Sequence, residues 1–272
     1  MPGFGLNQMT VPGLPVEAVL DLARATGCVG VELRNDLGRP LFDGQPPEAI
    51  AAQCADAGLA LLAVAEVKAF NAPDRDDFDD ARALAALARA SGARGVALIP
   101  QVTDAPVPRA DQRAALRRAL VALRPILEAE GVTGLIEPLG FSTSSLRYKA
   151  DVAEVVAALG DPGCFALVHD TFHHHLAGET EVFAPLTGLV HVSGVTDPAP
   201  GPDQMTDAHR VLVDADDRLG NIAQLRALDA LGHDGPVSFE AFSPRVHAMP
   251  DPASALAGSM SFITSQLAGV PA

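Results

Sequence analysis

Short apolar segments alternate with amphipathic, helix-like segments along the whole chain, and this alternation limits the folds that it can adopt. The 272 residues hold eight such pairs, which is about 34 residues for each, close to the length of one βα unit. The near-continuous apolar segment Leu59–Val67 is typical of a parallel strand that is covered on both faces. A chain of this kind is expected to form a parallel sheet, either open or closed into a barrel.

The expected elements follow from the apolar periodicity. Strands are expected at Gly3–Met9, Cys28–Leu33, Leu59–Val67, Gly95–Pro100, Val132–Leu139, Cys164–Asp170, Leu189–Val195 and Val237–Phe242. Helices are expected at Leu14–Thr26, Pro46–Ala57, Asp77–Ser91, Ala110–Glu130, Lys149–Leu159, Glu181–Leu186, Ile222–Leu231 and Ala253–Leu267. No GxGxxG or GxxxxGK[ST] motif follows an early strand, so the open nucleotide-binding folds lose their usual support. The count of eight favours one (β/α)₈ TIM barrel, with residues 1–272 as a single domain.

Charge and composition argue against several function classes. The net charge of −15 argues against nucleic-acid binding, because phosphate contacts need clustered Lys and Arg. No stretch approaches 18 consecutive apolar residues, so no membrane span is expected, and the N-terminus lacks the features of a signal peptide. Cys28, Cys54 and Cys164 are far apart and form no CxxC motif, which indicates a reducing compartment. We therefore expect a cytoplasmic protein.

Four expected strands end in acidic or imidazole side chains. Glu137 follows Gly-Leu-Ile, Asp170 follows Leu-Val-His, His191 follows Leu-Val, and Glu240 follows Val-Ser-Phe. The C-terminal strand ends of a barrel face one mouth, where active sites lie, so these four side chains should converge. Charged groups at the end of a buried strand are costly unless they are paired or bound to a metal.

Two Glu, one Asp and one His form a mixed oxygen and nitrogen donor set with three negative charges. One divalent ion would offset most of that charge, and Mn²⁺, Zn²⁺, Co²⁺ or Mg²⁺ would suit these ligands. Taken singly, each of the four is equally well explained as an ordinary polar residue that caps the barrel. Taken together, they favour the metal site.

The histidines near Asp170 have different expected roles. His173 lies three residues beyond Asp170, from where it can reach a substrate oxygen or support a ligand from the outer side. His174 and His175 are expected to be structural. Strand alternation points His169 outward toward the helices, as a buried, hydrogen-bonded residue and not a ligand.

Further candidates come with equally plausible structural explanations. Arg210 lies in the long connection 196–219, which could act as a lid, and it would bind a hydroxyl or carbonyl oxygen unless it is simply solvated. Asn71 could hydrogen-bond to substrate hydroxyls. The charged residues at the ends of the second and third strands could line the mouth or pair with one another: Glu32, Arg34, Glu66 and Lys68.

With these strand ends in place, the chain resembles the xylose isomerase-like barrel superfamily of sugar isomerases and epimerases, and most closely the inosose (2-keto-myo-inositol) isomerases of inositol catabolism. The resemblance extends over nearly the whole chain and includes Val31–Arg34, Ile136–Pro138, Val168–His175, Thr206–Val211 and Val237–Pro244. It implies that Glu137, Asp170, His191 and Glu240 ligate the metal and that His173 and Arg210 contact substrate. Family members usually carry a Pro-Gly-x-Gly turn after the loop arginine, whereas this chain has Val213–Arg218 there.

The resemblance and the donor set together predict an enzyme, a divalent-metal-dependent isomerase of a keto-polyol such as 2-keto-myo-inositol. Glu137 and Glu240 would remove and return the proton on the carbon beside the carbonyl, through a metal-stabilised enediolate. His173, Arg210, Asn71 and Arg34 are the expected substrate-binding residues.

Related activities use the same site and stay open: sugar epimerase, hydroxypyruvate-type isomerase and inosose dehydratase. A non-catalytic sugar-binding barrel is the alternative from another class. A metal-dependent abasic-site endonuclease shares the fold, but the charge of −15 argues against it. The expected partner is a small polyol or sugar, and the sequence leaves a homo-oligomer open.

Overall fold

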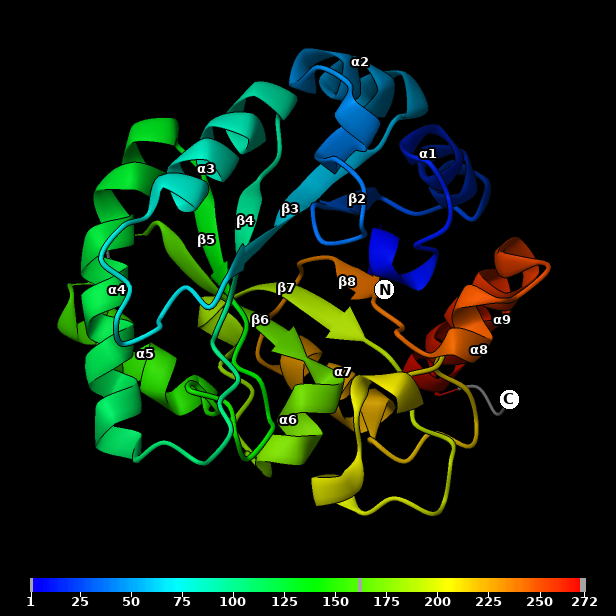
Figure 1. Cartoon of the computed structure of the whole chain (residues 1–272). Helices are drawn as coiled ribbons and strands as arrows, with labels where there is room; N and C mark the ends of the chain where they lie inside the picture. Colours follow the sequence, from blue (N-terminus) through cyan, green and yellow to red (C-terminus); the bar gives the residue numbers. More distant parts are fainter. Residues whose placement is uncertain (1, 161–162, 270–272) are drawn as a thin grey trace.

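Eight parallel strands close into a barrel, as the alternation predicts (Figure 1). The computed structural model describes residues 2–160 and 163–269. Neighbouring strands in the barrel are neighbours in the sequence, and β8 pairs with β1 to complete the ring. The strands are β1 (Phe4–Asn7), β2 (Gly30–Arg34), β3 (Ala60–Lys68), β4 (Gly95–Ile99), β5 (Thr133–Ile136), β6 (Phe165–Asp170), β7 (Thr187–Val192) and β8 (Val237–Phe239).

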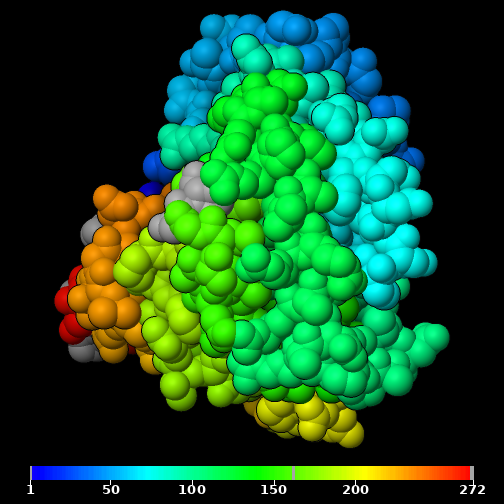
Figure 2. Space-filling model, turned by 90° about the vertical axis from the view of Figure 1, so that its left-hand side faces the viewer, coloured from blue at the N-terminus to red at the C-terminus, as the bar shows by residue number. Residues whose placement is uncertain are grey.

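Helices surround the barrel, and Figure 2 shows the continuous outer surface over α4 and α5, with residues near position 200 projecting at one edge. The α-helices are α1 (Val16–Ala25), α2 (Pro47–Ala57), α3 (Asp79–Ser91), α4 (Arg109–Glu130), α5 (Lys149–Ala158), α6 (Thr171–Ala177), α7 (Asn221–Ala230), α8 (Pro244–His247) and α9 (Pro252–Leu267). Short 3₁₀ turns are η1 (Gln8–Thr10), η2 (Leu41–Gly44), η3 (Ala184–Leu186), η4 (Pro202–Gln204) and η5 (Asp207–His209). In the described part of the chain, no helix is long and apolar enough to cross a bilayer.

The prediction of the sixth helix was wrong. The expected segment Glu181–Leu186 contains only the turn η3, whereas α6 begins directly after β6. Asp170 caps α6, because its Oδ1 accepts a hydrogen bond of 2.9 Å from the backbone N–H of His173. Gly178, at φ 67°, ends the helix after two turns. The strand end therefore decides where α6 starts, and the helix carries the histidine tract.

Aliphatic side chains and alanine fill most of the interior of the barrel and the layer beneath the helices. The C-terminal ends of the strands differ, because several charged and imidazole side chains are buried there. Burial of such groups is costly without partners. The chemistry of the chain is therefore concentrated at this end of the barrel.

Candidate metal centre

The four strand-end residues predicted as ligands do converge. Glu137, Asp170, His191 and Glu240 each offer one ligand atom, and these atoms all lie within 4.8 Å of one another. All four residues are buried. Each sits at or next to the C-terminal end of one of the strands β5 to β8, so the closure of the barrel brings them together.

His191 is at the centre of this group. Its Nδ1 lies 3.2 Å from Glu240 Oε2, 3.6 Å from Glu137 Oε2 and 3.9 Å from Asp170 Oδ2. This buried nitrogen has no hydrogen-bond partner among the described residues. A buried polar atom without a partner is rare and calls for an explanation, such as an ion that the protein binds there. The donor set therefore fits a divalent cation placed among these four atoms.

Arg210 connects two of the candidate ligands. Its Nη2 donates to Asp170 Oδ2 and, at 2.9 Å, to Glu240 Oε2, while its Nε donates to Ser193 Oγ at 3.0 Å. The guanidinium lies between two aromatic rings, 4.5 Å from the centroid of Phe242 and 5.1 Å from that of Phe172. The loop that carries Arg210 thus supports the ligands directly.

Arg34, at the end of β2, fixes the other side of Glu240. Its Nη1 donates to Glu240 Oε1 at 2.8 Å, and Asn7 Nδ2 donates to the same oxygen at 3.2 Å. The remaining nitrogens of Arg34 bind Asp36 at 2.8 Å and Glu66 at 3.3 Å. Both oxygens of Glu240 are therefore held by cations or amides.

The charges of the buried groups also favour a divalent ion. Four carboxylates of this cluster are no more than 4% exposed, and two buried guanidinium groups face them, one of which also pairs with Asp36 and Glu66. The excess is therefore at least two negative charges, and an ion of charge +2 would offset two of them while His191 stays neutral. The carboxylates are Glu32, Glu137, Asp170 and Glu240, and the guanidinium groups belong to Arg34 and Arg210.

The crowding of carboxylates shifts the pKa values of the site in opposite directions. Burial, together with the charge of Glu240, raises the pKa of Glu137 to about 7. Burial would also raise the pKa of Glu240, but His191, Arg210 and Arg34 outweigh it and hold that pKa well below its usual value. Burial lowers the pKa of His191, but the carboxylates of Glu240, Glu32 and Glu137 raise it well above 6.5.

His173 faces the cluster from the first turn of α6. Its Nε2 lies 3.9 Å from Glu137 Oε1, and its ring packs edge-on against Phe141 and Phe172. Its Nδ1 is buried without a partner among the described residues. Burial lowers the pKa of His173, so the neutral ring can exchange hydrogen bonds with a neutral hydroxyl.

Arg34 and His173 lie against the candidate ligands, whereas the polar atoms of Asn71 bond to the loops beside them. Its Oδ1 accepts from Gln101 N–H and from Ser145 Oγ, both at 3.0 Å, and its Nδ2 donates to the Ser145 carbonyl at 3.3 Å. Asn71 therefore joins the loops that follow β3, β4 and β5. Substrate binding by Asn71 stays a prediction.

The other histidines near Asp170 form a separate network behind the strand. Lys149 Nζ lies 2.9 Å from Nδ1 of His169 and 2.6 Å from Nδ1 of His174, and His169 Nε2 is 2.9 Å from Gln224 Oε1. His169 points away from the mouth, as strand alternation predicts. This network braces α5, β6, α6 and α7 and lies outside the ligand group.

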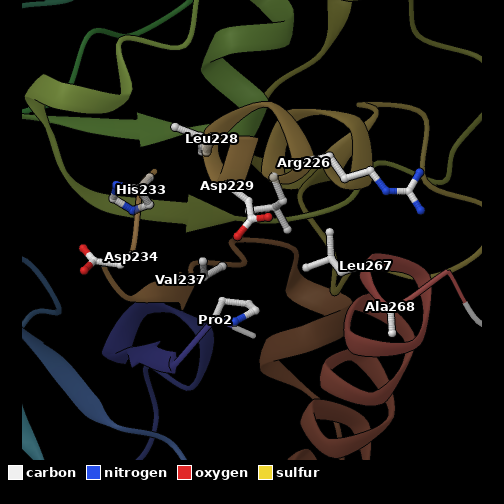
Figure 3. A pocket seen from close by; sticks show the side chains of 11 residues that line it. Pro2, Arg226, Leu228, Asp229, His233, Asp234, Val237, Leu267 and Ala268 are labelled. Atoms are coloured by element: carbon white, nitrogen blue, oxygen red, sulfur yellow. The ribbon is translucent and has the colours of Figure 1, made fainter. Parts of the chain in front are cut away.

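A cavity of about 250 Å³ lies at the opposite, N-terminal end of the barrel, between α7, α9 and the start of β8 (Figure 3). Its lining includes His233 and Asp229, and none of the candidate ligands. Active sites of such barrels lie at the C-terminal end, so this cavity is not the candidate site.

The sequence matches the family model of the xylose isomerase-like TIM barrel over residues 20–266. The chain belongs to this family. Curated protein sequences give no significant match. The family assignment agrees with the resemblance found from the strand-end motifs, at the level of the superfamily.

Solved structures of the xylose isomerase-like TIM barrel family superpose closely on this chain. A xylose isomerase domain containing protein from Salmonella typhimurium has a TM-score of 0.86 and 28% identity, over 98% of this chain and 97% of that one. The IolI protein with a bound zinc atom has a TM-score of 0.86 and 19% identity, over 98% and 99%. An L-ribulose 3-epimerase has a TM-score of 0.72 and 20% identity, over 99% and 95%. The fold is thus that of sugar isomerases and epimerases.

One contact was not predicted from the sequence. Glu32, on β2, accepts from His191 Nε2 at 3.0 Å, so it supports a ligand instead of merely lining the mouth. Its position in the apolar segment Val31–Leu33 was the available signal, because a buried glutamate needs a partner.

Proposed function

We propose that this protein is a divalent-metal-dependent isomerase of a neutral keto-polyol, with 2-keto-myo-inositol as the first substrate to test. The observation that carries the proposal is the convergence of Glu137, Asp170, His191 and Glu240, with the buried Nδ1 of His191 unpartnered among the described residues. The structurally similar IolI protein binds a zinc atom, which supports a metal ion as part of this site. Mn²⁺, Zn²⁺, Co²⁺ and Mg²⁺ are all compatible with the donor set.

A divalent ion at these ligands would polarise a carbonyl and stabilise the negative charge that develops when the neighbouring carbon loses its proton. The proton transfers would be carried out by side chains of the site. We assign the proton transfers to Glu137 and Glu240, and Glu137 has the freer carboxylate. Both oxygens of Glu240 accept hydrogen bonds from arginines, whereas Glu137 faces the imidazoles of His173 and His191.

The substrate contacts are assigned from the same geometry. His173 presents a neutral ring next to Glu137, where it can bind a hydroxyl of the polyol and orient the carbon that loses its proton. Arg210 and Arg34 have their guanidinium groups against the ligands, so any contact with substrate would come from donors that they also use to position Glu240.

Charge favours a neutral substrate over an acid or a phosphate ester. The two buried guanidinium groups and one divalent ion at most balance the four most buried carboxylates, and Arg34 also pairs with Asp36 and Glu66, so no positive charge is left over for an anion. A keto-polyol or a ketose satisfies this condition. The similarity in fold to an L-ribulose 3-epimerase makes ketose epimerisation the second activity to test.

The first experiment measures bound metal by elemental analysis after purification without chelator. Wild-type protein and the His175→Ala control should each retain about one ion per chain, because His175 belongs to the histidine tract but not to the donor set. The Asp170→Ala/His191→Ala variant should fold and retain none. A wild-type protein that takes up no added Mn²⁺, Co²⁺ or Zn²⁺ would refute the proposal.

The second experiment follows the metal-loaded protein with keto-inositols and ketoses in D₂O by NMR. Exchange of the proton beside the carbonyl, followed by a rearranged ketone, identifies the isomerase. An inverted hydroxyl identifies an epimerase, and loss of water identifies a dehydratase. Stoichiometric metal without exchange in any of these substrates would refute the keto-polyol isomerase.

A further inference from the structure

Glu32 makes a contact across the mouth of the barrel that bears directly on the donor set. Its side chain leaves β2 and reaches His191 on β7, which is 159 residues away in the sequence. His191 Nε2 lies 3.0 Å from Glu32 Oε2 and 3.2 Å from Oε1, so both oxygens are within hydrogen-bonding distance. Glu32 is only 1% exposed and His191 only 2%, so water does not compete for this bond.

This bond determines what the other nitrogen of the ring can do. A carboxylate accepts hydrogen bonds, so Nε2 must carry the proton and donate it to Glu32. A histidine that binds a metal ion is neutral and has one proton, so with the proton on Nε2 the lone pair of Nδ1 is the one left for the ion. Nδ1 is the atom that faces Glu137, Asp170 and Glu240 and has no partner among the described residues. The orientation of the ring and its tautomer are therefore both set from the far side.

We propose that Glu32 is the positioning residue of the metal centre, which selects Nδ1 of His191 as the ligand atom and holds the ring in place. The proposal rests on the proposed metal site. Glu32 does not touch the ion or the substrate. It acts through His191, and its negative charge also makes the imidazole a stronger donor.

The buried cations of the mouth allow a glutamate to stand at this position. Three ligand carboxylates already exceed the charge of one divalent ion, and Glu32 adds a fourth buried carboxylate. Arg34 and Arg210 compensate by binding Glu240 and Asp170. The site thus accommodates an additional anion, as is expected if that anion has a specific task.

The test compares Zn²⁺ affinity and the tautomer of His191 in three variants. Apo protein is titrated with Zn²⁺ against a chromophoric chelator, and long-range ¹H–¹⁵N spectra of the zinc-bound protein report which nitrogen of His191 carries the proton. Glu32→Ala should weaken Zn²⁺ binding by about 10–100-fold, as is typical for the loss of an outer carboxylate on a metal-bound histidine. Glu32→Gln keeps an acceptor oxygen and should recover part of the affinity and the wild-type tautomer.

Glu66→Gln is the matched control. Glu66 is also largely buried and belongs to the same charged cluster, but it pairs with Arg34 and not with His191. The Glu66→Gln variant should therefore lose far less Zn²⁺ affinity than the Glu32→Ala variant. An equal loss in both variants would mean that only the total charge matters, and would overturn the proposal.

Two further outcomes would also overturn it. One is wild-type affinity in Glu32→Ala. The other is a zinc-bound wild-type protein in which Nδ1 of His191 carries the proton, a result that needs no variant to fold. If wild-type protein binds none of Zn²⁺, Mn²⁺ and Co²⁺, the proposed function fails as well. If it binds the ion and only these results go against Glu32, the metal centre stands and the role of Glu32 does not.

Discussion

Arg210 is the buried cation on which the carboxylate cluster depends most, and its replacement by methionine tests that dependence. The side chain is 1% exposed and donates to Asp170, to Glu240 at 2.9 Å and to Ser193 at 3.0 Å. Methionine keeps much of the volume between Phe172 and Phe242 but supplies no donor. Arg210→Met therefore leaves two ligand carboxylates buried without their shared cation.

The expected cost follows from the burial of both partners. Breaking a buried ion pair by removal of one member typically costs about 3–5 kcal/mol. At about 2–4 °C of melting temperature for each kcal/mol in a protein of this size class, the apo variant should melt roughly 10 °C below wild type. A divalent ion neutralises the same carboxylates, so added Zn²⁺ should raise the melting temperature of the variant by more than that of wild type.

The assay is thermal unfolding followed by circular dichroism, with chelator and then with excess Zn²⁺. Arg124→Met is the control, because Arg124 pairs with Glu128 on the surface of α4, with both side chains over 40% exposed. That pair is worth at most about 0.5 kcal/mol. If Arg210→Met in chelator melts no lower than Arg124→Met, Arg210 does not neutralise the ligands and the charge accounting is wrong.

Three further changes probe other parts of the molecule. Gly140→Ala should lower the melting temperature markedly, because a Cβ there would stand 2.2 Å from the backbone oxygen of His173; an unchanged transition would show that α6 does not pack as described. Burial lowers the pKa of Lys149 from 10.5 to about 8, so its contribution to the free energy of unfolding should increase from about pH 8 to 10.5. In urea titrations over this interval, the free energy of unfolding of Lys149→Met should therefore rise less steeply with pH than that of wild type. Glu240→Gln should keep the fold and lower turnover of whichever ketone is the substrate by at least about 10²-fold, whereas a near wild-type kcat would remove Glu240 from the mechanism.

The convergence of the four candidate ligands could be predicted from the sequence because each of them ends an apolar segment. In a (β/α)₈ barrel, the position of a residue along its strand decides how close it lies to the mouth of the barrel. The alternation of side chains decides whether it points into the barrel or toward the helices. Glu137, Asp170, His191 and Glu240 all occupy the last inward position, so no knowledge of contacts was needed.

The sixth helix could not be predicted in this way. The segment Thr171–Ala177 holds three consecutive histidines and no clear apolar period, so its helical propensity is weak. The local cap by Asp170 stabilises it, and so does the packing of Phe172 and Leu176 against Val195, Met205 and Leu219, which lie far away in the sequence. Packing therefore overrides local preference here.

The sequence by itself determined the eightfold alternation, the mouth of the barrel and the identity of the four candidate ligands, because these depend on periodicity within each strand. Tertiary structure alone decided which buried charges meet. Glu32 reaches His191 across 159 positions, Arg34 reaches Glu240 across 206, and Arg210 joins Asp170 to Glu240. Such pairs form because barrel closure brings strand ends together in a space that water does not fill, where each charge must find a partner from another part of the chain.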